Sequence, residues 1–176
     1  MVVEIKKVGV IGAGQMGNGI AHVCAVAGFD VWLNDISVDR VQSGLASING
    51  NMARQVAKGL ITEDERTAAL DRLKPAESMD ELADVDLVIE SAVENEQIKR
   101  KIFAQLCPLL KPEAILATNT SSISITRLAA TTDRPERFIG IHFMNPVPLM
   151  ELVELVRGIA TEDETFEASK VFTRKL

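Results

Sequence analysis

VGVIGAGQMGNGIA, residues 8–21, is the stretch of sequence that decides the fold of this protein. An apolar run leads into the glycine motif Gly12-x-Gly14-x-x-Gly17, and apolar residues at helical spacing follow it. In a dinucleotide-binding βαβ unit, the first glycine permits a tight turn and the second lets a pyrophosphate approach the backbone. The third lets helix and strand pack closely. The pyrophosphate rests on the helix N-terminus, where free N–H groups and the helix dipole favour negative charge. The stretch therefore predicts a strand, a phosphate-binding turn and a helix.

A carboxylate after the second predicted strand indicates which dinucleotide binds. Residues 30–34 (DVWLN) predict that strand, and Asp35 follows it, about 20 residues beyond the glycine motif. A carboxylate at this position accepts hydrogen bonds from the adenosine ribose hydroxyls and would repel a 2′-phosphate. No arginine follows immediately to hold such a phosphate. The strand, the helix and this aspartate together favour an NAD site over a glycine-rich turn without function, and NAD over NADP.

The rest of the chain alternates between strand and helix patterns. Strands are predicted at residues 5–11, 30–34, 86–90, 114–118, 138–142 and 151–156. Two consecutive helices separate the second strand from the third. The first has an apolar stripe over residues 41–56, and the second begins at the capping box Thr62-x-x-Glu65 and ends before Pro75. The predicted fold is α/β, a Rossmann-type doubly wound, mostly parallel sheet with a helical hairpin inserted after the second strand.

The length of the chain and its last segment bear on domain organisation. The 176 residues suit one α/β domain and fall short of two. A second capping box, Thr161-x-x-Glu164, predicts a last helix that continues to Leu176 without a C-cap signal. Phe166 and Phe172 in this helix need a surface to pack against. We therefore expect residues 1–176 to form one NAD-binding domain that ends within a linking helix.

Composition and charge disfavour several classes of function. The formal net charge is −6 and no run of Lys or Arg stands out, so we expect no nucleic-acid partner. No apolar stretch is long enough for a membrane span, and no signal-peptide pattern precedes the first strand. We expect no membrane partner and a cytoplasmic location, or an organelle matrix if a transit peptide has been removed. Cys24 and Cys107 lack metal-ligand spacing, so we predict no metal site and interpret both as small buried hydrophobes.

One of the two histidines lies where chemistry is expected. His22 falls inside the first predicted helix and is interpreted as a surface or packed residue. His142 ends a strand at the carboxyl edge of the sheet, where α/β folds bind ligands. Glu154 shares a strand face with Leu152 and Val156, an apolar setting in which a carboxylate needs a partner. A carboxylate on one imidazole nitrogen raises the basicity of the other, which suits a base for alcohol oxidation beside a nicotinamide.

The residues alone leave two alternatives open. His142 and Glu154 are equally consistent with a structural histidine at a strand end and an exposed glutamate on an edge strand. Ser121 and Ser122 follow the predicted strand that ends at Thr118. A hydroxyl at this position binds a substrate oxygen in one interpretation, and caps a helix or forms a turn in the other.

Four segments together resemble one enzyme family. They are VGVIGAGQMGNGIA, VIESAVENEQIKRKIF (88–103), ATNTSSISIT (117–126) and IHFMNPVPLMELVELV (141–156). Over essentially the whole chain they resemble the L-3-hydroxyacyl-CoA dehydrogenases, in particular the 3-hydroxybutyryl-CoA dehydrogenase type. The resemblance implies NAD-dependent oxidation of a 3-hydroxyacyl-CoA to the 3-oxoacyl-CoA, and the reverse, by a His–Glu dyad. It also implies a C-terminal helical domain, absent from this chain, that completes the acyl-CoA site, contributes an active-site Asn and makes the interface of a homodimer.

The resemblance further implies roles for individual residues. His142 is the expected base for the 3-hydroxyl, and Glu154 is its dyad partner. Ser121 is expected to hydrogen-bond the reacting oxygen, and Asn145 to help shape the site. The expected cofactor-binding residues are Gly12, Gly14, Gln15, Met16, Gly17, Asp35, Glu94, Lys99 and Asn119.

Two of these expectations depend on the resemblance entirely. Glu94 and Lys99 are expected to lie along the cofactor and substrate cleft. Taken from their surroundings in the sequence alone, they are interpreted as a solvated loop carboxylate and a helix-surface lysine.

Two other functions compete with the dehydrogenase. A non-catalytic NAD(H)-binding module is consistent with the cofactor motif and with the missing helical domain. A β-hydroxyacid dehydrogenase of the 6-phosphogluconate type has a similar glycine-rich turn. That group typically prefers NADP through an arginine after the second strand and uses a lysine base, so Asp35 and the His–Glu pair disfavour it.

Overall fold

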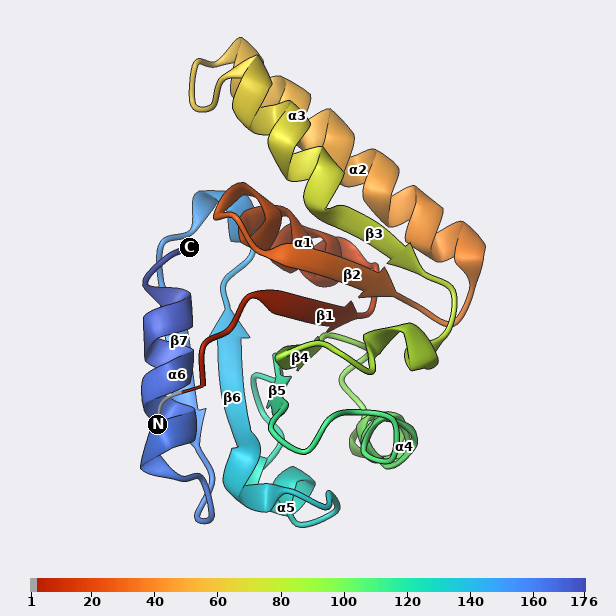
Figure 1. The fold of residues 1–176 in the computed structure, drawn as a ribbon, viewed down its shortest axis with the longest axis vertical. Coiled ribbons are helices and arrows are strands. Elements are labelled where there is room, and N and C mark those ends of the chain that lie inside the picture. Colours follow the sequence, from red (N-terminus) through yellow and green to blue (C-terminus); the bar gives the residue numbers. More distant parts are fainter. Residues whose placement is uncertain (1–2) are drawn as a thin grey trace.

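The computed structural model describes residues 3–176, and this part of the chain contains one seven-stranded sheet with the strand order β3-β2-β1-β4-β5-β6-β7 (Figure 1). The first six strands are parallel, and the seventh pairs antiparallel with the sixth. Their bounds are β1 Lys7–Ile11, β2 Asp30–Asn34, β3 Leu73–Ala76, β4 Leu87–Glu90, β5 Ile115–Thr118, β6 Phe138–Phe143 and β7 Val153–Arg157. The order reverses between β1 and β4, which is the switch point where doubly wound sheets bind nucleotides.

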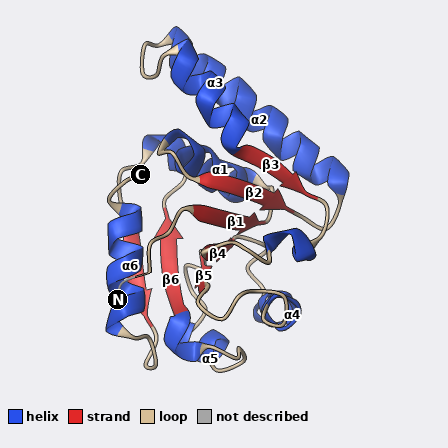
Figure 2. Ribbon diagram, in the orientation of Figure 1, coloured by secondary structure: helices blue, strands red, loops and turns tan. Residues whose placement is uncertain are grey.

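Helices cover both faces of the sheet, as the alternating pattern predicts (Figure 2). Their bounds are α1 Gln15–Val26, α2 Val38–Ala57, α3 Glu63–Arg72, α4 Glu96–Leu106, α5 Ile125–Ala129 and α6 Asp163–Thr173. The short 3₁₀ turns are η1 Met79–Leu82, η2 Pro135–Arg137 and η3 Val147–Leu149. One buried cluster joins α1 and α6 to the sheet, and a second joins α4 and α5 to its other face. The fold is thus the predicted Rossmann-type α/β sheet.

The helical hairpin α2–α3 extends beyond the edge of the sheet (Figure 1). Its second helix begins at the capping box that the sequence predicts. The Glu65 amide donates to Thr62 Oγ1 at 3.1 Å, and the Thr62 amide donates to Glu65 Oε2 at 2.7 Å. Together these bonds satisfy two backbone donors that the start of a helix leaves free.

The strand β3 was not predicted, because Pro75 lies inside it. Proline has no N–H group to donate, which argues against a central strand. β3 pairs with β2 alone and lies at the end of the strand order, so its other side needs no partner. The edge position explains why proline is tolerated here.

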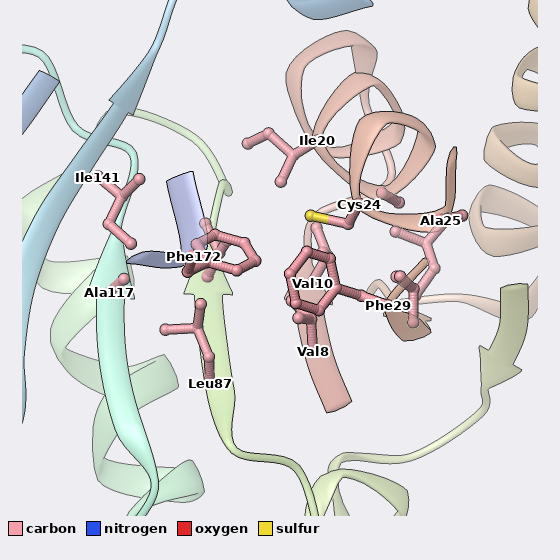
Figure 3. Close-up of a cluster of buried hydrophobic side chains, with 14 of the residues drawn as sticks. Val8, Val10, Ile20, Cys24, Ala25, Phe29, Leu87, Ala117, Ile141 and Phe172 are labelled. Carbon is pink, nitrogen blue, oxygen red and sulfur yellow. The ribbon is translucent and has the colours of Figure 1, made fainter. Parts of the chain in front are cut away.

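The last helix packs on this domain itself, over β6 and β7 (Figure 1). Phe172 is 1% exposed, and its ring centroid lies 4.9 Å from that of Phe29 (Figure 3). The predicted capping box at Thr161 is wrong. Its hydroxyl instead accepts from the Gly158 amide and donates to the Phe138 carbonyl, each at 2.8 Å. The helix also ends at Thr173 rather than continuing to the last residue, which corrects the expectation of a helix that runs off the end.

Both cysteines are buried, as the sequence analysis predicts. Burial raises the pKa of the Cys24 and Cys107 thiols, so both stay protonated. No helix within residues 3–176 is long and apolar enough to cross a membrane.

Candidate active site

The glycine turn joins β1 to α1 at the switch point of the sheet. Gly12 has φ +100°, and a Cβ there would collide with the carbonyl oxygen of Ser91. A Cβ at Gly17 would collide with the carbonyl oxygen of Gly12, so helix and strand approach closely. At Gly14, by contrast, a Cβ would meet nothing within 4 Å, and no side chain caps the helix. The helix N-terminus therefore presents open N–H groups and space, which fits a pyrophosphate.

Asp35 lies beside this turn, immediately after β2. Its Oδ2 accepts from the Ala13 amide at 2.7 Å, and its Oδ1 accepts from the Ile36 amide at 2.6 Å. Each carboxylate oxygen keeps a further lone pair for another donor. The side chain is thus held against the phosphate turn with capacity for the ribose hydroxyls of a dinucleotide.

His142 and Glu154 meet across the antiparallel strands β6 and β7. The two residues are directly opposite each other in the register, and His142 Nδ1 lies 2.8 Å from Glu154 Oε2. Since the carboxylate can only accept, Nδ1 is assigned the proton and Nε2 becomes the acceptor. The histidine side chain is 22% exposed, so this nitrogen can reach a bound substrate.

The reason given for expecting this pair is wrong, although the contact itself is present. The sequence analysis places Glu154 on a buried apolar face with Leu152 and Val156. In the structure all three are exposed, and the Glu154 side chain is 52% exposed. β7 is the edge strand, and its Glu154 face is not covered within the described residues. Register, rather than burial, brings the two side chains together.

Loops from β5 and β6 converge on the same edge of the sheet. Asn119 Oδ1 accepts from the Phe143 amide at 2.8 Å, which fixes the β5 loop beside His142. Gln15, at the start of α1, donates through Nε2 to Asn145 Oδ1 at 3.2 Å. These two bonds join the cofactor turn, the β5 loop and the turn after β6 into one site.

Ser121 and Met16 take different positions around this site. The Ser121 side chain is exposed in the β5 loop. It does not cap α5, because Ser124 accepts from the Arg127 amide in that role. Met16 packs partly buried against the core behind the glycine turn.

The two residues expected along the cleft have different surroundings in the structure. Glu94 is exposed and accepts a hydrogen bond from the Thr120 hydroxyl, which joins the β4 and β5 loops. Lys99 is neither in the cleft nor on the helix surface: its side chain is 1% exposed and ion-paired with Glu90. α4 presents this position to the sheet, and such burial depends on packing that a local pattern does not reveal.

The sequence analysis missed the residues of α2 that line a hollow next to the glycine turn. It has a volume of about 740 Å³ and lies between the N-terminus of α1 and α2, beside Gly14 and Gln15. A smaller cavity of about 180 Å³ shares Asn51 and Arg54 with it and extends to Lys58, His22, Pro146 and Pro148. The polar face of α2 was the sequence signal that could have indicated this hollow, but such a face is also typical of any helix exposed to solvent.

His22 is a packed residue in this wall. Its side chain is buried, and Nε2 lies 2.8 Å from Gln55 Oε1. Burial lowers the pKa of His22, so the ring is neutral. Within the described residues, no group of His, Cys, Asp or Glu is arranged to hold a metal ion.

A glycine turn with an open helix N-terminus, a carboxylate held beside it and a His–Glu contact, all at one edge of a doubly wound sheet, are features of an NAD-binding dehydrogenase domain of the Rossmann class. Comparison with known families agrees with this class. The family described as "3-hydroxyacyl-CoA dehydrogenase, NAD binding domain" matches residues 7–176, and the chain belongs to it.

Individual relatives give the same result. All 176 residues align at 73% identity with a 3-hydroxybutyryl-CoA dehydrogenase of Bradyrhizobium diazoefficiens, and the chain spans 60% of the length of that relative. The crystal structure of (S)-3-hydroxybutyryl-CoA dehydrogenase from Ralstonia eutropha is similar with a TM-score of 0.95 and 48% identity, over 98% of this chain and 61% of that one. The 3-hydroxybutyryl-CoA dehydrogenase structure from Escherichia coli has a TM-score of 0.96 and 42% identity, over 98% and 37% of the two chains.

Proposed function

We propose that this chain is the cofactor-binding and proton-transferring part of an NAD-dependent 3-hydroxyacyl-CoA dehydrogenase, with 3-hydroxybutyryl-CoA as the preferred substrate. The observation that carries the proposal is the His142–Glu154 hydrogen bond, located at the sheet edge that also holds the glycine turn. The names of the relatives support the substrate class.

The chemistry needs a hydride acceptor and a proton acceptor at one carbon. Bound NAD⁺ supplies the acceptor for the hydride that leaves C3 of the substrate. His142 Nε2 takes the proton from the 3-hydroxyl as the C–O bond becomes a carbonyl. Glu154 holds the Nδ1 proton and stabilises the imidazolium that forms. In the reverse direction the same nitrogen returns the proton to the oxygen.

Two further side chains are assigned to orienting the substrate. The exposed Ser121 hydroxyl is proposed to donate a hydrogen bond to the reacting oxygen. Asn145, whose side-chain oxygen accepts a hydrogen bond from Gln15, is proposed to shape the wall beside the reacting oxygen. A hydrogen bond to this oxygen grows stronger as negative charge develops on it during hydride transfer to the 3-oxo group.

The charge of the neighbouring cavity suits an acyl-CoA. Arg54 and Lys58 line it together with the prolines of the turn that carries Asn145. CoA carries several phosphate charges at one end and the reacting acyl group at the other. A cationic wall beside the turn is complementary to that distribution of charge.

The test is oxidation of NADH by acetoacetyl-CoA, followed by its absorbance, with the chain and with His142→Ala. We expect turnover that the substitution lowers by about 10²–10⁴-fold, while NADH binding is retained. Equal turnover in both proteins contradicts the dyad. NADH binding without turnover in the unsubstituted chain supports the non-catalytic module instead. Turnover of free hydroxy acids but not of acyl-CoA supports the 6-phosphogluconate type.

The homodimer that the family resemblance implies and the cytoplasmic location stay predictions. Sedimentation of the purified protein tests the first, and fractionation of the source cells tests the second.

A further inference from the structure

The proline turn, residues 144–150, follows β6 and packs on one face of α1. Four residues of this helix, at helical spacing, are bonded to the turn, close to it or line a cavity with it: Gln15, Gly19, His22 and Val23. The N-terminus of the same helix is open to a pyrophosphate. One helix therefore supports both the phosphate turn and the turn that carries Asn145.

At Gly19 the helix and the proline turn approach too closely for a side chain. A Cβ at this position would lie 2.9 Å from Val147 Cβ and 3.2 Å from Val147 Cγ2. Carbon atoms in ordinary contact are about 3.5–4.0 Å apart. Gly19 lies inside α1 without a positive φ, so the backbone does not require glycine, and glycine within a helix lowers stability relative to alanine. The close contact with Val147 is what requires a glycine here.

The depth at which the turn sits on α1 also decides where Asn145 lies. Asn145 is two residues before Val147, and its Oδ1 accepts from Gln15 Nε2 at 3.2 Å, the long end of the range for such bonds. A methyl group at Gly19 needs about 0.6 Å more room to reach ordinary contact with Val147. A movement of the turn by that amount away from the helix breaks the bond to Gln15 and releases the asparagine.

We propose that Gly19 is a positioning residue for the substrate side of the site. The missing side chain lets the proline turn sit deep on α1, and this depth holds Asn145 in the wall beside the reacting oxygen. Gly19 acts through Val147 and Asn145, without contact with nucleotide or substrate. The inference rests on the proposed function for its effect on turnover, whereas the placement of the turn is measurable without it.

Gly19→Ala tests the proposal through turnover and cofactor binding in one protein. Turnover is followed as oxidation of NADH by acetoacetyl-CoA, and NADH affinity by quenching of Trp32 fluorescence. We expect kcat to fall about tenfold, the effect of about one lost hydrogen bond. NADH affinity should stay unchanged, because the phosphate turn is not touched. An unchanged kcat overturns the proposal.

A second substitution makes room for the new methyl group. Val147→Gly removes the atoms that the alanine at position 19 would meet, and since Val147 is 5% exposed, this change alone lowers the unfolding midpoint. In the double variant, Gly19→Ala with Val147→Gly, we expect most of the lost kcat to return while the unfolding midpoint stays below that of the unsubstituted chain. If kcat instead follows the unfolding midpoint through these variants, the contact is merely structural and the proposal is overturned.

Gly9→Ala is a matched control on the other side of the sheet. A Cβ at Gly9 would lie 3.1 Å from Leu82 Cδ2, in the cluster that α1 does not join. We expect a changed unfolding midpoint with unchanged kcat and NADH affinity. A loss of kcat equal to that in Gly19→Ala would show that any crowding in the domain suffices, and would overturn the proposal.

NMR spectra of the isotope-labelled chain locate the turn without turnover. The backbone amide signals of Met144 and Asn145 should shift in Gly19→Ala, return towards their original positions in the double variant and stay in place in Gly9→Ala. Signals that do not move in Gly19→Ala overturn the proposal. If the unsubstituted chain shows no turnover, the proposed function fails, but these signals still decide the inference.

A milder substitution decides the matter if Gly19→Ala does not fold. Gln15→Ala removes the exposed side chain that bonds Asn145 and leaves the buried contact with Val147 intact. A lower kcat at an unchanged unfolding midpoint supports the proposal. An unchanged kcat overturns it, because the position of Asn145 then has no effect on the reaction.

Discussion

His142 and Glu154 are paired directly across the antiparallel strands β6 and β7, with Nδ1 of the histidine 2.8 Å from Oε2 of the glutamate. Opposite residues on one face of such a pair have Cβ atoms about 5 Å apart, close enough for these two side chains to meet without a bend in either strand. The contact is thus a direct result of strand register. The glutamate is half exposed, so its contribution to stability is small and its contribution to the chemistry can be measured separately.

Glu154→Gln separates these two contributions. The amide carbonyl can still accept the Nδ1 proton, but the negative charge that stabilises the imidazolium is lost. We expect kcat for acetoacetyl-CoA reduction to fall about 10–100-fold, the effect of one hydrogen bond to a charged group. The free energy of unfolding should change by less than about 1 kcal/mol, as for other exposed pairs. Unchanged kcat with lowered stability would contradict the assigned role.

Gly14→Ala is expected to leave stability nearly unchanged, whereas Gly17→Ala is expected to lower it. A methyl group at Gly14 meets no atom within 4 Å, so the free energy of unfolding should change by less than about 0.5 kcal/mol. NADH affinity should fall about tenfold or more, because the pyrophosphate is expected to approach the backbone at this position. At Gly17 the methyl group collides with the Gly12 backbone, and we expect a loss of about 3 kcal/mol or more. Urea unfolding and NADH titration check both. Full NADH affinity in Gly14→Ala would place the pyrophosphate elsewhere.

Asp35→Asn tests the choice of cofactor. The amide oxygen can still accept the Ala13 N–H and so hold the turn, although the bond from the Ile36 amide is lost, and the charge that repels a 2′-phosphate is gone. We expect NADH binding to weaken about 10–100-fold and the preference for NADH over NADPH to narrow. Separate titrations with the two nucleotides measure this. A preference that is unchanged by the substitution would remove Asp35 from the ribose site.

His22 makes stability depend on pH. Burial lowers the pKa of its ring below the ordinary value of 6.5, so between those two pKa values the unfolded chain binds a proton that the folded chain does not. The stabilisation is therefore present above pH 6.5 and is lost as the pH falls towards the pKa of the folded state. Urea unfolding at pH 7.5 and pH 5 should show a drop in stability that is smaller in His22→Gln. An identical drop in both proteins would assign the effect to other groups.

Much of the fold was predictable because its signals are local. The glycine spacing, the strand patterns and the capping box at Thr62 each depend on a few consecutive residues, and the structure contains all of them. The strand β3 was missed because Pro75 argues against a strand unless its edge position is known. The false capping box at Thr161 arose because the same short motif also suits a turn whose hydroxyl bonds to other partners.

The sequence by itself determined the Rossmann order of strands and helices, the phosphate turn and Asp35 beside it, because glycine spacing and hydrophobic period act over short distances. Only the tertiary structure decided that Lys99 is buried against Glu90, that Glu154 is exposed on an edge strand, and that Phe172 packs on Phe29. Burial and register depend on which distant segments pack together. A pattern within one segment does not carry that information.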